Sequence, residues 1–321
     1  MRRLGANGPE VPVFGLGSWN TWDRMTPEAS AELIATAVGR GINLFDVAHY
    51  NFGPHAENAT TDILFGEAVR EAGIAREDYL LCGKIWLWDY PAADFTGQMR
   101  TSMERIGVER ADYVVLGDFF GPLDINAVVN EIGELMRDGW FTEWGINNWS
   151  ARDVWQAREI ALAQGVRPPA FAQLKYSLAR RSVPEGEPYG RLLTDGGMSL
   201  QASDIFEGGI LAGKLQPARK IGADPGGIRD RIIASYPELE AVAVRLEATP
   251  AQVAVAFCLA NPAVATILFG VSSLDQLDQN LGALDLLARH GDTLRQQLTD
   301  LWIDRDVVDP AASWGTDAPE V

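Results

Sequence analysis

Short apolar runs alternate with longer amphipathic stretches along most of the chain. The short runs have the length of strands and are bounded by turn-forming residues. The long stretches repeat apolar positions every three or four residues, which predicts helices, and several open with Ser, Thr or Asp at the capping position. The predicted strands are Val11–Gly17, Leu44–Ala48, Tyr79–Lys84, Tyr113–Leu116, Phe141–Ile146, Ala170–Lys175, Met198–Ala202 and Ala265–Phe269. The predicted helices are Pro27–Arg40, Ala59–Ala72, Ala93–Ile106, Ile125–Arg137, Ala151–Gln164 and Pro250–Leu259.

The order and spacing of these elements predict a barrel. Strand and helix alternate about eight times with a repeat of roughly 35 residues, as in a (β/α)8 barrel. Most predicted strands are apolar throughout, which is typical of strands covered on both faces. No Ser-, Gly- or Pro-rich linker divides the chain. We therefore expect an α/β protein with a single TIM barrel over residues 1–321, a mobile loop near 216–237 and a C-terminal extension near 307–321.

Composition and charge narrow the expected partners. The chain is 47% hydrophobic and 22% charged, as in ordinary globular proteins. It has 27 Lys and Arg against 44 Asp and Glu, a net charge of -17. Such a field repels phosphate backbones and anionic lipids, so neither nucleic acid nor a membrane surface is an expected partner. The sequence has no secretory leader pattern and no apolar run of about 18 residues, so we expect a cytoplasmic protein.

The cysteines do not indicate a metal centre. Cys82 and Cys258 lie far apart in sequence and in apolar surroundings. This spacing matches neither a zinc site nor a disulfide framework. We expect no metal and a reducing compartment.

Two charged residues end neighbouring predicted strands. Asp46 follows Leu44-Phe45, and Lys84 ends the next strand. A half-buried carboxylate needs a cation, and the carboxyl ends of barrel strands meet at the catalytic face. We therefore expect an ion pair of Asp46 with Lys84 that tunes a nearby acid, with a purely structural ion pair as the alternative. A neutral imidazole at His49, beside Tyr50, can transfer a proton near pH 7, and the alternative is an inert loop histidine.

Aromatic side chains lie at or just beyond the ends of several predicted strands. We expect some of them to line a substantially apolar substrate pocket and the others to serve packing alone. The candidates are Trp19, Trp86, Trp88, Phe119, Phe120 and Trp149.

Eight short motifs follow one another from Gly15 to Asn280. Four are Phe45–Ala48, Leu81–Lys84, Gly145–Ser150 and Gly270–Ser273, and the other four are Gly15–Trp19, Gln173–Ser177, Gly208–Lys214 and Gln276–Asn280. Each motif alone is weak, but their common order and spacing are specific. On these motifs the chain resembles the aldo-keto reductase family.

The resemblance implies the transfer of a hydride from a nicotinamide cofactor to a carbonyl group, with NADP as the family default and NAD as the alternative. It also implies that a Tyr donates the proton and that a Lys paired with an Asp lowers the pKa of this Tyr. Lys84 and Asp46 stand at the two tuning positions. The family's Tyr position, five residues after the Asp, holds Asn51 here. Tyr50 takes the role only if the loop is shifted by one residue.

Two further positions depart from the family pattern. Phe120 stands where the family has a catalytic His, and Ser203 stands where an aromatic residue flanks the nicotinamide. A hydrogen-bond donor and a stacking ring are therefore missing. We expect His49 to assist Tyr50.

The resemblance also assigns residues to the cofactor. Glycines let a backbone approach phosphate closely, and a helix N-terminus suits a phosphate group. Many relatives carry Arg where Ser273 stands, so a weakened preference for NADP is expected. The assigned residues are Asn147, Asn148 and Gln173 for the carboxamide, Leu211, Gly213 and Lys214 for the pyrophosphate, and Gly270, Ser272, Ser273, Gln276, Gln279 and Asn280 for the adenosine end.

The expected function is an NAD(P)H-dependent oxidoreductase of the aldo-keto reductase type acting on an aldehyde, ketone or enone of a small organic molecule. One alternative is altered chemistry on the same fold, a redox-neutral elimination or isomerisation, because Asn51 and Phe120 disturb the site for the substrate oxygen. Another is a non-catalytic cofactor-binding homologue, against which the presence of Asp46 and Lys84 argues.

Overall fold

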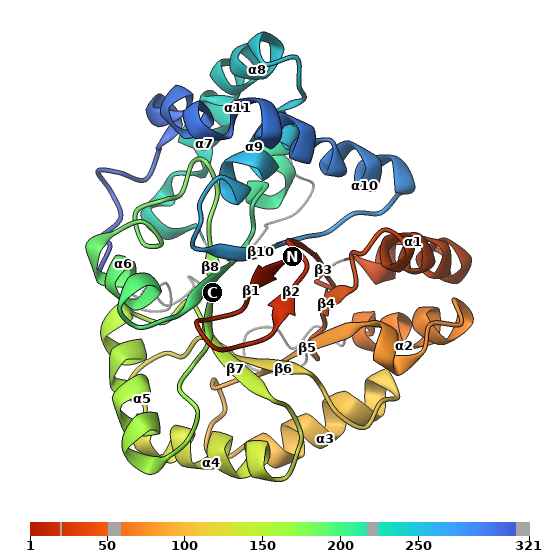
Figure 1. Ribbon diagram of the computed structural model, residues 1–321, viewed down its shortest axis with the longest axis vertical. Coiled ribbons are helices and arrows are strands. Elements are labelled where there is room, and N and C mark those ends of the chain that lie inside the picture. The colour runs from red at the N-terminus through yellow and green to blue at the C-terminus, as the bar shows by residue number, and fades with distance from the viewer. Residues whose placement is uncertain (20, 51–58, 217–223, 313–321) are drawn as a thin grey trace.

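The central feature of the computed structural model is a closed barrel of eight parallel strands surrounded by helices (Figure 1). The structure describes residues 1–19, 21–50, 59–216 and 224–312. The strands follow one another round the barrel in chain order, and the last closes against the first. They are β3 (Phe14–Gly17), β4 (Leu44–Asp46), β5 (Leu80–Ile85), β6 (Tyr113–Leu116), β7 (Glu143–Asn147), β8 (Phe171–Lys175), β9 (Ser199–Ser203) and β10 (Val264–Phe269). The predicted (β/α)8 TIM barrel is confirmed.

A short hairpin covers the amino end of the barrel. Its strands β1 (Arg2–Arg3) and β2 (Glu10–Val11) pair antiparallel and lie across the middle of the ring of strands in Figure 1. The Arg2 guanidinium donates to main-chain carbonyls beside the start of β10, including that of Val264 at 2.6 Å. The expected strand Val11–Gly17 is therefore wrong in extent: Val11 belongs to the hairpin, and Pro12, which has no N–H to donate, separates it from β3.

The helices form the outer layer, and several begin at a side chain that accepts a main-chain N–H of the first turn. Ser150 caps in this way before Ala151, as expected. The α-helices are α1 (Pro27–Gly39), α2 (Thr61–Glu71), α3 (Phe95–Ile106), α4 (Ile125–Arg137), α5 (Ala151–Gln164), α6 (Glu187–Thr194), α7 (Arg229–Ala234), α8 (Tyr236–Arg245), α9 (Pro250–Leu259), α10 (Leu274–Leu281) and α11 (Ala283–Gln297). The 3-10 helices are η1 (Trp22–Arg24), η3 (Arg76–Asp78), η4 (Glu207–Ala212), η5 (Pro225–Gly227) and η6 (Thr299–Leu301).

The segment expected as a loop at 216–237 is partly helical. It contains η5, α7 and the start of α8, and Ile232 of α7 is fully buried in the hydrophobic core. The Gly and Pro residues that indicated a loop lie within 217–227, apart from Pro237 in the first turn of α8, so the expectation was wrong for residues 229–237. Residues 217–223, and residues 313–321 of the expected C-terminal extension, lie outside the described ranges.

The described ranges give little indication of a membrane span or of a metal site. No helix there is long and apolar enough by itself to cross a membrane, and only α8 with α9, bent by 84°, reaches that length and composition as a pair. In the same ranges, no three His, Cys, Asp or Glu side chains are grouped so that they could hold a metal ion.

Helices α2 and α3 approach each other closely at Gly66. A Cβ at this position would lie 2.0 Å from the carbonyl oxygen of Ile106, so only glycine fits without a shift of the backbone. The close approach places Asp62 of α2 against Arg105 of α3, with Nε 2.6 Å and Nη2 2.8 Å from its two carboxylate oxygens.

Gly66→Ala is expected to lower the free energy of unfolding by about 1–3 kcal/mol, because the helices must separate to admit the methyl group. Gly39→Ala is the matched control, since an added Cβ on this last residue of α1 meets no atom within 4 Å. Its stability should be unchanged or higher by up to about 1 kcal/mol. Urea unfolding measures both changes. Equal stability of the two variants would contradict the close packing of α2 on α3.

Candidate active site

Four polar side chains meet inside the carboxyl end of the barrel, and all four are buried. Lys84 of β5 donates from Nζ to Oε1 of Gln173, which comes from β8, at 2.9 Å. The Gln173 amide nitrogen donates to Oδ2 of Asp46 at 2.7 Å and to Oε1 of Gln201 at 2.8 Å. The side chain of Gln173 therefore links the ammonium of Lys84 to the carboxylate of Asp46.

The expected direct ion pair between Asp46 and Lys84 is wrong. Within the described residues, no oxygen of Asp46 lies within 4.0 Å of the Lys84 nitrogen. The strands do place both side chains on one face, because Asp46 is in register with Cys82, two residues before Lys84. Gln173 reaches across the barrel and satisfies both groups, so the two charges are bridged by an amide.

Tyr50 lies among aromatic rings beside this group. Its ring stacks on Trp19 with centroids 6.1 Å apart, and it lies 5.7 Å from the ring of Trp86. Lys84 Nζ lies 5.2 Å from the same Trp86 ring, a cation–π distance. In the part of the chain that the structure describes, no hydrogen bond joins the Tyr50 hydroxyl to Lys84. Asn51, which stands at the family's Tyr position, lies outside the described residues.

The environment of Tyr50 does not lower its pKa. Burial raises the pKa of the phenol well above its usual value, and the negative charge of Asp46 raises it further. An interaction with the Ser18 hydroxyl opposes these two effects. The tuning implied by the resemblance is therefore absent here, and the phenol stays neutral at pH 7.

The imidazole of His49 is turned toward α2 and α3. Its Nδ1 lies 3.3 Å from Oδ2 of Asp62, which is fully buried and also accepts two bonds from Arg105. Burial raises the pKa of Asp62, but the bonds from His49 and Arg105 outweigh it and the pKa lies below its usual value. The indole N–H of Trp86 donates to the His49 carbonyl at 2.7 Å. A carboxylate at Nδ1 favours the tautomer with its hydrogen there, which leaves Nε2 as the atom that accepts a proton.

Asp62 and Arg105 were not among the expected site residues. The sequence carries a signal for Asp62, since it shares a helix stripe with Phe65, Gly66 and Val69, all buried in α2. A carboxylate on such a stripe must find a cation or donors. No comparable signal identifies Arg105 as the cation, because α3 is a separate element.

A second ionic group lies at the ends of β8 and β9. Lys175 Nζ lies 2.5 Å from Oδ2 of Asp204, whose backbone has φ 54°. Burial raises the pKa of Asp204, but Lys175 outweighs this effect and the pKa lies below its usual value. Asp204 also accepts the N–H of Gly208 at 3.1 Å. This group fixes the turn after Ser203, where the expected pyrophosphate segment begins.

The residues assigned to the carboxamide converge at the ends of β7 and β8. Asn147 donates to the main-chain carbonyl of Gln173 at 3.1 Å, and Asn148, with φ 57°, accepts the N–H of Lys175 at 3.2 Å. Among the described residues, nothing donates to the side-chain oxygen of Asn147. Gln173 is different, because both hydrogens of its amide are already donated to Asp46 and Gln201.

The residues assigned to the adenosine end surround the start of α10. Ser273 accepts the N–H of Gln276 as the helix cap, and the Gln276 side chain accepts the N–H of Ser272 at 2.9 Å. Gly270 and Gln279 are exposed. Asn280 is only 4% exposed, and within the described ranges no hydrogen bond reaches its side-chain amide.

These residues fit a nicotinamide dinucleotide. The Asn280 side chain, at a residue only 4% exposed, makes no hydrogen bond within the described ranges, so its amide is available to a ligand. Gly213 has φ 92°, a conformation that favours glycine, and lies between buried Leu211 and exposed Lys214. Lys214 supplies a cation suited to a phosphate.

The six aromatic candidates differ in burial. Trp86 and Trp149 are buried, and the Trp149 N–H donates to the Gly117 carbonyl at 2.8 Å. Trp88 and Phe119 are half-buried: Trp88 stacks on Trp86 at 4.4 Å, and Phe119 meets Trp149 edge to face at 5.1 Å. Trp19 and Phe120 are 41% and 40% exposed.

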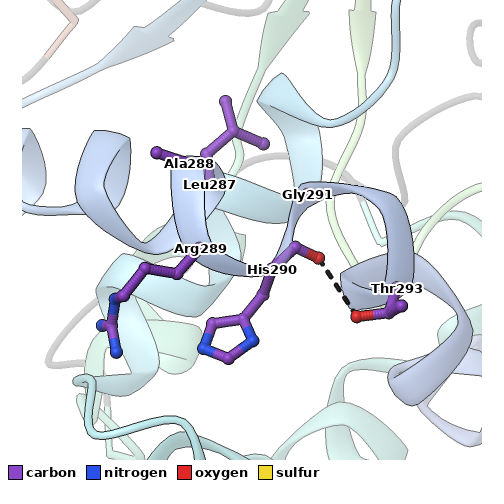
Figure 2. A pocket seen from close by; sticks show the side chains of 6 residues that line it. All are labelled: Leu287, Ala288, Arg289, His290, Gly291 and Thr293. Carbon is purple, nitrogen blue, oxygen red and sulfur yellow. Dashed lines mark hydrogen bonds between the residues drawn. The ribbon is translucent and has the colours of Figure 1, made fainter.

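Two surface depressions lie away from this site. Figure 2 shows one on α11, lined by Leu287 to Gly291 and by Thr293, with no residue from a strand end. The other is lined partly by residues that precede β6 and β7, Asp112 and Phe141 among them, and so lies toward the amino end of the barrel. Neither includes Lys84, Asp46 or Tyr50.

Comparison with known proteins agrees with the barrel fold. The model of the aldo/keto reductase family matches residues 13–292. Among solved structures, the thermostable aldo-keto reductase Tm1743, crystallised with the inhibitor epalrestat, superposes with a TM-score of 0.73. It is 22% identical, and the match covers 94% of this chain and 98% of that one. The chain belongs to the aldo/keto reductase family.

Proposed function

We propose that the protein is an NAD(P)H-dependent oxidoreductase that reduces the carbonyl group of a small aldehyde, ketone or enone. The observation that carries the proposal is the buried ammonium of Lys84, held by Gln173 at the carboxyl end of the barrel, with the neutral phenol of Tyr50 packed against the same Trp86 ring. A cation and a proton donor in one apolar site are what a carbonyl oxygen needs as it gains negative charge.

When bound, the cofactor supplies the hydride that adds to the carbonyl carbon. Tyr50 gives its phenolic proton to the carbonyl oxygen, so that an alcohol forms. The charge of Lys84 stabilises the resulting phenolate until solvent returns a proton. The exposed rings of Trp19 and Phe120 would bind the apolar part of the substrate and exclude water.

The residues proposed to hold the cofactor are those whose hydrogen-bonding groups are not all used by other described residues. Asn147 would take the carboxamide, Lys214 the pyrophosphate and Asn280 the adenine. NADP is the family default, but Ser273 places no cation at the 2′-phosphate. NAD is therefore the alternative cofactor.

A redox-neutral elimination or isomerisation is the second candidate function. One observation favours it: the Tyr50 hydroxyl makes no hydrogen bond to Lys84 within the described residues, and burial raises its pKa. In that reaction Lys84 would stabilise an enolate oxygen and His49 would move the proton. The reduced cofactor would not be consumed.

Mixing the purified protein with NADPH or NADH and a panel of carbonyl compounds tests the proposal. We expect quenching of the tryptophan fluorescence by either cofactor and stoichiometric loss of reduced cofactor with at least one compound. Product formation without cofactor loss would support the second candidate. Absence of any binding signal for both cofactors, up to about millimolar, would exclude the proposed carbonyl reduction.

Tyr50→Phe is expected to lower kcat by at least about 100-fold, the low end for general acid catalysis, with little change in cofactor affinity. Tyr90→Phe, at a tyrosine whose hydroxyl donates to Glu131 of α4, is the matched control and should keep wild-type turnover. Initial rates and fluorescence titration measure the two effects. Near-normal turnover of Tyr50→Phe with an inactive His49→Ala would transfer the acid role to His49.

Ser273→Arg is expected to shift the preference toward NADPH over NADH by about 1–3 kcal/mol, through a charged hydrogen bond to the 2′-phosphate. The substitution also removes the cap of α10, which costs about 1 kcal/mol of stability. Ser273→Ala loses the same cap without adding charge and should leave the preference unchanged. The two dissociation constants for each variant, measured by calorimetry, give the comparison. An unchanged ratio in Ser273→Arg would refute the assignment of this position to the 2′-phosphate.

A further inference from the structure

A row of polar side chains crosses four neighbouring strands inside the barrel. Asn147 of β7 is in register with Gln173 of β8, Gln173 with Gln201 of β9, and Gln201 with Thr266 of β10. Register partners in a parallel sheet point to the same side, and Gln173 points inward, since it reaches Asp46. Barrel interiors are usually filled with branched apolar residues. The hydroxyl of Thr266 is buried with no partner in the described part of the chain.

Gln173 is the one member of the row that touches both charged side chains across the barrel. Its oxygen accepts from Lys84, and its two amide hydrogens go to Asp46 and Gln201. These contacts use both donors of the side chain. Gln173 is 3% exposed, so water cannot readily replace it.

Lys84 and Asp46 are placed to pair with each other if the amide is removed. Asp46 is in register with Cys82, two residues before Lys84, so both side chains project from the same face of neighbouring strands. A lysine side chain is long and flexible enough to span such a diagonal. Two buried opposite charges without another partner attract strongly.

We propose that Gln173 is a positioning residue that keeps Lys84 and Asp46 apart and thereby sets the charge that faces the Tyr50 hydroxyl. The proposal deepens the proposed function, on which the catalytic meaning of Tyr50 rests. Gln173 is also one of the residues assigned to the carboxamide of the cofactor. Its positioning role applies to the protein without bound cofactor.

The charges around Tyr50 determine in which direction its ionisation should change when Gln173 is replaced. The groups that act on the phenol are Asp46 of β4, Asp62 of α2, the Cys82 thiol of β5 and the Ser18 hydroxyl, and Lys84 Nζ contacts the Trp86 ring against which Tyr50 also packs. A negative neighbour disfavours the phenolate and a positive one favours it. With the amide in place, the negative charge of Asp46 raises the pKa of Tyr50, and the Ser18 hydroxyl is the group that lowers it. If Lys84 closed on Asp46, the two charges would largely cancel, and the phenol would ionise more easily.

The test uses the ionisation of Tyr50 in the protein without cofactor or substrate. Tyrosine labelled with carbon-13 at the hydroxyl-bearing ring carbon reports ionisation for each of the 7 tyrosines, and Tyr50→Phe identifies the signal. In the wild type this signal should titrate well above the usual range of a tyrosine, if at all, because burial and Asp46 raise the pKa. Gln173→Met fills similar space without hydrogen bonds, and the Tyr50 signal should then titrate at least about one pH unit lower than in the wild type.

Two further variants show whether the effect is specific. Gln201→Met makes the same change one strand away but keeps the link between Lys84 and Asp46, so the Tyr50 titration should match the wild type. Gln173→Glu keeps an acceptor for Lys84 and adds a negative charge, so Tyr50 should titrate no lower than in the wild type. Gln173→Leu repeats the test if methionine is not accommodated.

An unchanged Tyr50 titration in folded Gln173→Met or Gln173→Leu would overturn the proposal. A lowered titration in Gln173→Glu or Gln201→Met would overturn it as well, because it would indicate general loosening of the barrel. The proposed function fails on a different result, the absence of cofactor binding or turnover, so the two failures are distinguishable.

Discussion

The burial of the Lys84 charge inside the barrel is the constraint on which the site depends. An ammonium group removed from water must be hydrogen-bonded and balanced by negative charge, or it destabilises the fold. Gln173 supplies the hydrogen bond and carries the link to Asp46. These three residues come from β5, β8 and β4, strands that meet only because the barrel closes. The closed barrel therefore brings these three side chains together, and their hydrogen bonds in turn stabilise the charges buried inside the barrel.

The sequence was sufficient to predict the barrel. The alternation of apolar runs with amphipathic stretches gave eight strands, most within two residues of those observed, because buried parallel strands are apolar and turn residues bound them. It also placed Asp46 and Lys84 at strand ends on one face. The direct ion pair between them was wrong, since that inference considered neighbouring strands alone. Gln173 lies across the barrel, and no local pattern reveals a partner that arrives from the opposite wall.

The surroundings of Tyr50 and His49 illustrate the same limit. Their positions after β4 follow from the sequence, but the direction of each side chain depends on contacts with separate elements. Asp62 and Arg105 hold the His49 ring toward the outer helices, an arrangement made possible by the close approach at Gly66. Trp19 and Trp86 enclose the Tyr50 ring. The raised pKa of Tyr50 follows from this enclosure and from Asp46, and neither effect can be read from residue spacing.

In the proposed reaction the charge of Lys84 is necessary for the chemical step and unnecessary for holding the cofactor. The most direct measurement is a single-turnover experiment on Lys84→Met, following the loss of reduced cofactor with an excess of a carbonyl substrate that the wild type accepts. The expected rate is at least about 100-fold below the wild type, with the cofactor dissociation constant within about threefold. A wild-type rate in Lys84→Met would contradict this role of Lys84.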